Sequence, residues 1–349
     1  MAAALAVAGC GPPRTLSAVQ RWDDVEQVPP EFGPSVVTLG NFDGVHLGHR
    51  SVLGDVVGRA RVRGVSAVAV TFDPHPLQVL YPETAPVPLT GLDQRLELMA
   101  ETGLDAALVM TFTRELATWS PEDFVRRVFA EALRAVEVVV GRDVRFGHRN
   151  SGDLTTMREL GAAYGFAVTA MDDIGTSDGQ RQGGGETEPG GRRWSSTWTR
   201  ELLGEGDVSG AARILGRPHR VDGIVVHGDH RGRELGYPTA NLDPHPIGLI
   251  PADGVYAGWL DRLDLAPEAI DRHLPAAISI GTNPTFDGTT RRVEAYVLDR
   301  TDLDLYGERV GIEFVQRLRP TVRFDSVDTL LVQMAEDVDR CHDVLGIAR

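Results

Sequence analysis

The feature that most constrains the fold is a regular alternation of apolar runs and helical patterns between residues 35 and 171. The apolar runs are almost uniformly hydrophobic, which is typical of strands buried on both faces of a sheet. Strands that alternate with helices form a parallel sheet covered by helices on both sides. The runs lie at 35–39, 66–72, 106–112, 136–141 and 165–171, and the helical patterns at about 47–62, 91–102, 120–134 and 153–163. We therefore predict an α/β domain over residues 31–204.

The second half of the chain has a different pattern. Residues 175–193 are rich in glycine and polar side chains, which predicts a flexible loop. A helical stretch follows, with Ser196 or Thr197 as its expected N-cap, and leads into a connecting helix or linker at 205–217. Several apolar segments separated by short turns then predict an antiparallel barrel or sandwich over 218–349, with a C-terminal helix.

The charge balance limits the classes of partner and of phosphate chemistry. A net charge of -15 argues against nucleic acid and anionic membranes, because binding to them depends on basic surface. The chain contains no lysine, so all 35 basic residues are arginine. This composition excludes a Walker P-loop and a Schiff-base enzyme, since both depend on a lysine amine. Any phosphate must be held by backbone N–H groups, arginine, histidine, hydroxyls or a metal ion.

The two cysteines and the N-terminal residues bear on the cellular compartment. Cys10 and Cys341 stand in unrelated contexts and form no disulfide framework, which favours a reducing cytoplasm. Residues 7–10, Val-Ala-Gly-Cys, look like a lipoprotein processing box, but no basic residue precedes them. We expect residues 1–30 to be a disordered N-terminal extension of a cytoplasmic protein.

Two histidines, His46 and His49, follow a glycine-rich segment between the first expected strand and helix. In an open parallel sheet, ligands bind at the carboxyl ends of strands, where a helix N-terminus offers free N–H groups to an anion. Gly40, Gly44 and Gly48 would let a ligand approach the backbone closely. The context favours a phosphate site. A zinc pair, which needs a third ligand, and structural packing stay open as alternatives.

The segment GNFDGVHLGH at 40–49 resembles the signature of the HxGH nucleotidyltransferases. It is most similar to the adenylyltransferase module of bacterial bifunctional riboflavin kinase/FAD synthetases. Further segments resemble that module in the expected order, namely TFDPHP at 71–76, FTRELATWSPEDFV at 112–125, VVVGRDVRFGHRNSGD at 138–153 and SSTWTR at 195–200. The resemblance implies a Rossmann-like domain that transfers the adenylyl group of ATP to FMN and releases pyrophosphate.

The resemblance also implies which residues contact the substrates. His46 and His49 would act catalytically by hydrogen-bonding the α- and β-phosphates, and Arg200 would hold phosphate from the opposite side. Val144 departs from the family, which usually has an aromatic residue there, and the 175–193 loop looks longer than the family's. The implied ATP contacts are Gly40, Phe42, Asp43, His46, His49, Ser196, Thr197 and Arg200, and the implied FMN contacts are Phe72, Pro74, Phe112, Asp143 and Phe146.

Several of these residues have a simpler explanation when each is taken alone. A single phenylalanine among Phe72, Phe112 and Phe146 is more readily explained as core packing. Asp43 is as well explained by the formation of a turn as by contact with a metal or nucleotide.

In the second half, GDHRGRELGYPTANL at 228–242 is the strongest candidate segment. Residues two apart in an extended segment face the same way, so Thr239 and Asn241 could share one Mg²⁺ with ATP oxygens. Taken alone, they are better explained as a surface turn. However, the segment resembles the riboflavin kinase motif, and the segments at 251–259, 279–286, 291–299, 304–307 and 317–320 resemble that family in order.

This second resemblance implies an antiparallel six-stranded β-barrel with a C-terminal helix. Glu294 would be the general base for the riboflavin 5′-hydroxyl, and residues 304–307 would cover the flavin and exclude water. The implied kinase ATP contacts are Gly232, Arg233, Gly236, Thr239, Asn241 and Asn283, and the implied flavin contacts are Glu294, Asp304, Tyr306 and Gly307.

Together the two resemblances imply a bifunctional riboflavin kinase/FMN adenylyltransferase. Its ligands would be riboflavin, FMN, FAD and ATP with Mg²⁺, without nucleic-acid or membrane partners, in a monomer or transient homo-oligomer. One alternative is a pantetheine-phosphate or nicotinamide-nucleotide adenylyltransferase joined to an unrelated β domain. Another is a non-enzymatic flavin-binding or regulatory protein.

Overall fold

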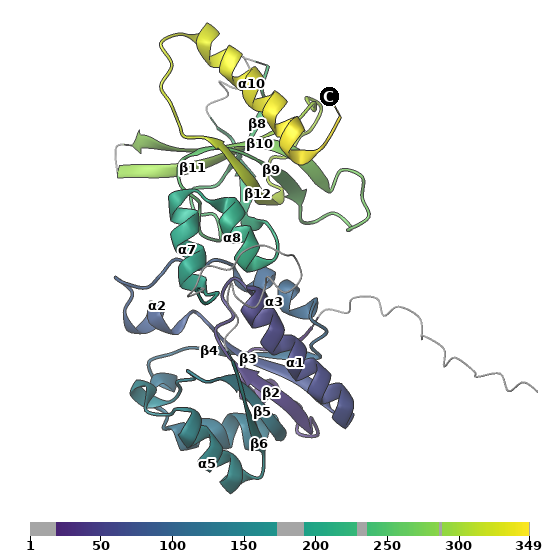
Figure 1. Ribbon diagram of the computed structural model, residues 1–349, viewed down its shortest axis with the longest axis vertical. Helices are drawn as coiled ribbons and strands as arrows, with labels where there is room; N and C mark the ends of the chain where they lie inside the picture. The colour runs from purple at the N-terminus through teal and green to yellow at the C-terminus, as the bar shows by residue number, and fades with distance from the viewer. Residues whose placement is uncertain (1–18, 173–191, 229–235, 286–287, 349) are drawn as a thin grey trace, which may run out of the picture.

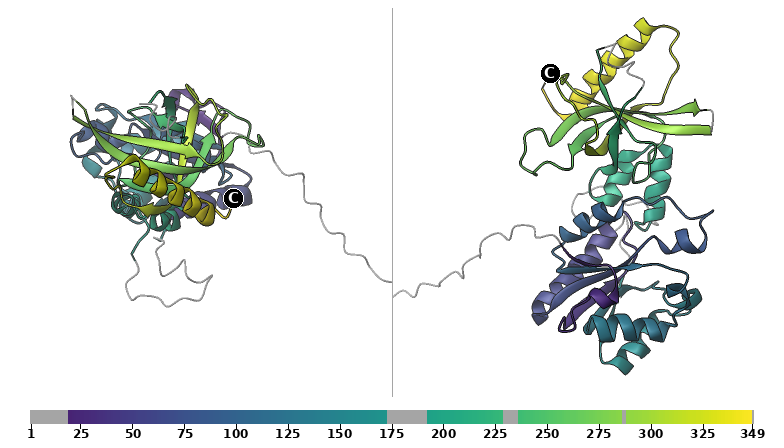
Figure 2. Two further views of the ribbon diagram at one scale, coloured as in Figure 1. Left: turned by 90° about the horizontal axis from the view of Figure 1, so that it is seen from above. Right: turned by 180° about the vertical axis from the view of Figure 1, so that it is seen from behind.

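The computed structural model describes residues 19–172, 192–228, 236–285 and 288–348. A sheet domain and a barrel lie at opposite ends of an elongated molecule, and the helices α7 (Ser196–Glu205) and α8 (Val208–Leu215) lie between them (Figures 1 and 2). The C-terminus lies at the barrel end, beside α10 (Val327–Leu345).

The first domain is built on a six-stranded parallel sheet in the order β1-β4-β3-β2-β5-β6. Five of these strands match the apolar runs of the sequence. The strands are β1 (Gln20–Trp22), β2 (Ser35–Leu39), β3 (Ser66–Asp73), β4 (Ala106–Thr111), β5 (Ala135–Gly141) and β6 (Ala167–Met171). The predicted parallel α/β sheet is therefore confirmed.

Successive strand residues pack on opposite faces of this sheet, which explains why the strands are apolar throughout. On one face, Val36 and Ala67 pack with side chains of α1 (Leu47–Arg63) and α3 (Leu92–Ala100). On the other face, Val37 and Val68 pack with residues 124–129 and with α5 (Leu154–Tyr164). Short helices complete the domain: α2 (Pro76–Leu80), α4 (Pro121–Phe124) and a π-helix (Val125–Ala132).

The second domain is a closed antiparallel barrel with the strand order β10-β11-β8-β7-β12-β9. Alternate residues such as Ala276, Ile278 and Ile280 fill its interior. The C-terminal helix α10 covers β9 through Cys341. The strands are β7 (His219–Val226), β8 (Thr239–Leu242), β9 (Gly254–Arg262), β10 (His273–Thr285), β11 (Gly288–Val297) and β12 (Arg309–Arg319). The predicted six-stranded barrel with a C-terminal helix is confirmed.

Two local expectations turn out differently, and a third is not tested. The expected disordered extension, residues 1–30, includes an ordered strand, because β1 pairs with β4 and buries Trp22. The N-cap of α7 is Ser195, whose side chain accepts a hydrogen bond from the N–H of Trp198, and not Ser196 or Thr197. Residues 173–191, most of the expected flexible loop, lie outside the described part of the chain.

Candidate active sites

The backbone between β2 and α1 forms a tight turn that brings His46 to the helix N-terminus. Phe42, Gly44 and Val45 all have positive φ angles, of 49°, 79° and 39°. Such a conformation is costly for a β-branched residue such as Val45, by about 1–3 kcal/mol, and persists only where the surroundings enforce it. His46 is the N-cap of α1, and its Nδ1 accepts a hydrogen bond from the N–H of His49 at 3.3 Å.

The two histidines form a stacked pair, with ring centroids 3.6 Å apart and planes inclined by 19°. The Phe42 ring meets His49 edge-on at 5.3 Å. Burial, followed by the charges of Arg193 and Arg217, lowers the pKa of His46 to about 4. Burial, followed by the charges of His46 and Arg193, lowers the pKa of His49 well below its ordinary value. Both imidazoles are therefore neutral near pH 7, and each can offer an N–H group as a hydrogen-bond donor.

A cleft of about 510 Å³ brings the histidine turn together with the start of α7. Nine of the residues predicted to contact ATP or FMN line it: Gly40, Phe42, Asp43, His46, His49, Asp143, Ser196, Thr197 and Arg200. Sequence segments more than 140 residues apart thus meet at the carboxyl end of the sheet, as the strand–helix pattern predicts.

Asp43 connects the two walls of this cleft. Its buried carboxylate accepts hydrogen bonds from the N–H groups of Leu89 and Thr90, at 2.9 and 3.2 Å, and forms an ion pair with Arg200. The hydroxyl of Ser196 donates to the Asp43 carbonyl oxygen at 2.9 Å. Asp43 therefore orients the turn and Arg200, which agrees with the structural alternative raised for it.

Of the residues predicted to form the flavin side, Asp143 lines this cleft, but the three phenylalanines and Pro74 are not among its lining residues. Phe72 contacts both Phe112 and Phe124, with ring centroids 5.5 and 6.4 Å apart. Phe146 is buried against Phe124. Pro74 follows β3 at the same sheet edge. Phe146 is thus core packing in this structure, whereas Phe72 and Phe112 are only partly buried.

Sequence reasoning missed several residues at this site. His75 lines the cleft, and its Nε2 lies 3.0 Å from the amide nitrogen of Asn41. Arg193 lines the cleft as well and forms an ion pair with Asp143 at 2.8 Å. The motifs contained Asn41 and His75, but only the fold shows that they face each other.

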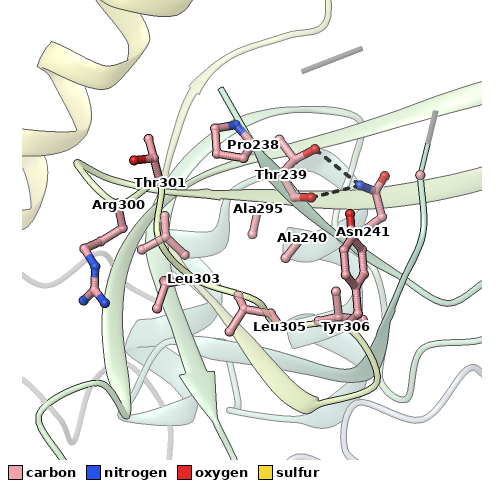
Figure 3. A pocket seen from close by; sticks show the side chains of 13 residues that line it. Pro238, Thr239, Ala240, Asn241, Ala295, Arg300, Thr301, Leu303, Leu305 and Tyr306 are labelled. Atoms are coloured by element: carbon pink, nitrogen blue, oxygen red, sulfur yellow. Dashed lines mark hydrogen bonds between the residues drawn. The ribbon is translucent and has the colours of Figure 1, made fainter. Parts of the chain in front are cut away.

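On the barrel, Thr239 and Asn241 lie side by side at a small pocket (Figure 3). They project from the outer face of β8, because Ala240 and Leu242 between and beyond them are buried in the barrel. The Asn241 amide donates to the Thr239 hydroxyl at 3.3 Å and to its carbonyl oxygen at 3.2 Å. In this orientation the amide nitrogen of Asn241 faces the Thr239 hydroxyl, and the amide oxygen points away from it (Figure 3). The oxygen of each side chain is a hard ligand of the kind that suits Mg²⁺.

Glu294 lies beside this pair. In the antiparallel pairing of β11 with β8, Glu294 is opposite Asn241 and Tyr296 is opposite Thr239. Directly opposed residues project from the same face of a sheet, so the Glu294 carboxylate lies on the outer face with Thr239 and Asn241. Its neighbours Val293 and Ala295 are buried in the barrel. The fold thus groups the predicted base with the predicted metal ligands.

The segment after β11 forms one wall of the same pocket, through Leu303, Leu305 and Tyr306 (Figure 3). The Tyr306 ring lies against His227, with ring centroids 3.9 Å apart and planes inclined by 33°. The N–H of Gly307, at φ 78°, donates to the Val225 carbonyl oxygen. Asp304 accepts a hydrogen bond from the Tyr306 N–H at 3.4 Å.

The remaining predicted kinase contacts are only partly described. Gly236 is described and exposed, at φ 87°. Asn283 pairs with Thr290 through the backbone of β10 and β11. Gly232 and Arg233 lie outside the described residues.

Two further observations bear on the alternatives. Within the described ranges, three potential metal-ligating side chains converge only at Asp261, His273 and Glu313, a group that includes neither His46 nor His49. The zinc alternative for the histidine pair therefore gains no third ligand there. None of the described helices has the length and apolar character needed to cross a membrane.

Comparison with known proteins agrees with this geometry. Residues 28–182 match the family model described as FAD synthetase, and residues 215–345 match the model described as riboflavin kinase. A bifunctional riboflavin kinase/FMN adenylyltransferase of Escherichia coli is 34% identical, over 90% of this chain and 94% of its own length. A protein of the same name from Listeria monocytogenes is 35% identical, over 90% of this chain and 91% of its own.

A solved structure from Streptococcus pneumoniae, described as a macrolide-efflux protein, shares the fold of nearly the whole chain. Its TM-score is 0.78 at 27% identity, over 93% of this chain and 99% of that one. The two-domain architecture is therefore common to both. Taken with the two family models and the curated relatives, these findings show that the chain belongs to the bifunctional riboflavin kinase/FMN adenylyltransferase family.

Proposed function

We propose that this chain phosphorylates riboflavin with ATP on its barrel and adenylylates the resulting FMN with a second ATP on its sheet domain. The observation that carries the proposal is the presence of two separate groups of side chains, one in the cleft between the histidine turn and α7 and the other on the barrel. His46, His49 and Arg200 belong to one group, and Thr239, Asn241 and Glu294 to the other. Both reactions depend mainly on positioning and charge stabilisation, which such groups can supply.

In adenylyl transfer, a phosphate oxygen of FMN bonds to the α-phosphorus of ATP. The bond from that phosphorus to the oxygen bridging to the β-phosphate breaks, and pyrophosphate leaves. Neutral His46 and His49 donate N–H groups to phosphate oxygens, and the α1 N-terminus adds a partial positive charge. Arg200 and the hydroxyls of Ser196 and Thr197 hold the leaving phosphates from the other wall of the cleft.

In the kinase reaction, Glu294 accepts the proton of the riboflavin 5′-hydroxyl, and the freed oxygen bonds to the γ-phosphorus of ATP. The bond from that phosphorus to its β-bridging oxygen breaks, and ADP leaves. Thr239 and Asn241 would hold Mg²⁺, which neutralises phosphate charge when bound. The wall formed by Leu305 and Tyr306 would cover the flavin and exclude water.

The other predicted contacts keep their proposed tasks. Gly232, Arg233, Gly236 and Asn283 would contact the kinase ATP, and Phe72, Pro74, Phe112 and Asp143 would contact FMN. With a net charge of -15, the enzyme would act on small molecules in the cytoplasm, as a monomer or transient homo-oligomer, without nucleic-acid or membrane partners.

The test is to incubate the purified chain with riboflavin, ATP and Mg²⁺ and to separate the flavins by chromatography. We expect FMN to appear first and FAD to follow. If neither FMN nor FAD appears, the proposal is contradicted. Pantetheine phosphate and nicotinamide mononucleotide, offered with ATP, test the alternative adenylyltransferases, and neither should be adenylylated.

A further inference from the structure

Arg217 lies where the helical connection enters the barrel, two residues before β7 begins at His219. It belongs to the segment that matches the riboflavin kinase model. Its side chain nevertheless reaches the histidine turn of the sheet domain. One terminal nitrogen donates to the Gly44 carbonyl oxygen at 2.8 Å, and the other donates to the Val45 carbonyl oxygen at 3.4 Å.

These two carbonyl groups immediately precede His46 and belong to the strained part of the turn. Gly44 and Val45 have φ angles of 79° and 39°. The other side of the turn is held from the sheet domain, where the Gly44 N–H donates to the Thr90 hydroxyl at 3.1 Å. Arg217 thus supplies hydrogen-bond donors to a stretch whose conformation is unfavourable on its own.

The position of Arg217 is itself enclosed. Gly216 packs so closely on Leu47 that an added Cβ would lie 2.5 Å from the leucine side chain. Gly44 likewise lies against Leu89 and Leu215. A third hydrogen bond, to the Leu215 carbonyl oxygen at 3.3 Å, fixes the guanidinium locally. Burial lowers the pKa of Arg217 to about 10, which leaves the group charged at neutral pH.

We infer that Arg217 is a positioning residue for adenylyl transfer, contributed by the segment that leads into the kinase barrel. Arg217 holds the carbonyl groups of Gly44 and Val45 so that His46 and His49 face the ATP phosphates. It is not among the residues that line the cleft, so it acts through the turn and not on the substrate. This inference rests on the adenylyl-transfer role proposed for the histidines.

The experiment compares Arg217→Ala and Arg217→Lys with the wild-type chain, measuring FAD formation from supplied FMN and FMN formation from riboflavin. We expect Arg217→Ala to lower kcat for FAD formation by about tenfold to a hundredfold, because small displacements of catalytic groups have effects of that size. The KM for ATP should change less than kcat. The kinase rate should stay within about twofold of wild type, because the kinase residues lie on the barrel.

Two further variants separate positioning from a general structural role. Arg213→Ala removes a neighbouring arginine whose side chain is 75% exposed, and should leave both activities unchanged. Added guanidinium at millimolar concentration should partly restore FAD formation in Arg217→Ala, and Arg217→Lys should fall between the wild type and the alanine variant. Neither recovery is expected if the alanine variant is simply misfolded.

The outcomes are distinct. Wild-type kcat for FAD formation in Arg217→Ala would overturn the inference, and so would an equal loss of both activities without rescue. A parallel measurement on His49→Ala tests the underlying proposal. If His49→Ala forms FAD at the wild-type rate, the proposed role of the histidines fails, whatever Arg217 does.

Discussion

Replacing Asp43 with alanine should destabilise the chain and disable the adenylyltransferase cleft. The substitution leaves the buried N–H groups of Leu89 and Thr90 without their acceptor and leaves Arg200 without its carboxylate. Each unsatisfied buried N–H costs about 1–3 kcal/mol. Breaking a buried ion pair costs about 3–5 kcal/mol. The cost of leaving Arg200 unpaired is smaller, because its side chain is 18% exposed to water. Because these contributions share one carboxylate they do not add, and we expect a total loss of about 3–5 kcal/mol.

The assay is denaturant unfolding of Asp43→Ala, Asp43→Asn and wild type, followed by tryptophan fluorescence and circular dichroism. The asparagine variant keeps an acceptor oxygen of the same shape and should lose about half as much or less. Because a two-domain chain need not unfold in one step, the two probes must be compared for coincidence. A loss below about 1 kcal/mol in Asp43→Ala would refute the assignment of Asp43 as the residue that orients the turn and Arg200.

Three other predictions follow from the sites. The pKa of His46 is lowered to about 4 in the folded chain, from its ordinary value of about 6.5. The neutral histidine therefore contributes to the free energy of unfolding above pH 6.5, and this contribution is lost as the pH falls towards 4. Between pH 7 and pH 5, the free energy of unfolding should fall less in His46→Asn than in the wild type. Asn241→Ala should raise the Mg²⁺ concentration needed for FMN formation several-fold but not that for FAD formation. Tyr306→Ala should raise the KM for riboflavin several-fold, because it removes the aromatic side chain of the pocket wall proposed to cover the flavin.

The sequence predicted the layers of the fold because burial leaves a periodic trace. Uniformly apolar runs separated by helical patterns correspond to β2 through β6, and short apolar segments between turns correspond to the barrel strands. The strand β1 escaped prediction because it has three residues, Gln20–Trp22, of which only Trp22 is buried. A pattern that short carries no periodicity.

The candidate sites were predictable where one segment carries several site residues, as in the histidine turn and in residues 238–241. The supporting contacts were not, because their partners are far apart in the chain. Arg217 is 172 residues from Val45, and Arg200 is 157 residues from Asp43. No local pattern indicates that these side chains meet. The packing of α7 and α8 between the two domains brings them together.

The most direct test of the central claim, two independent sites on one chain, is flavin chromatography of Glu294→Ala and His49→Ala. We predict that Glu294→Ala forms no FMN from riboflavin yet converts supplied FMN to FAD. His49→Ala should accumulate FMN and form little or no FAD. If either substitution abolishes both reactions in a chain that remains folded by circular dichroism, the account of two separate sites is contradicted.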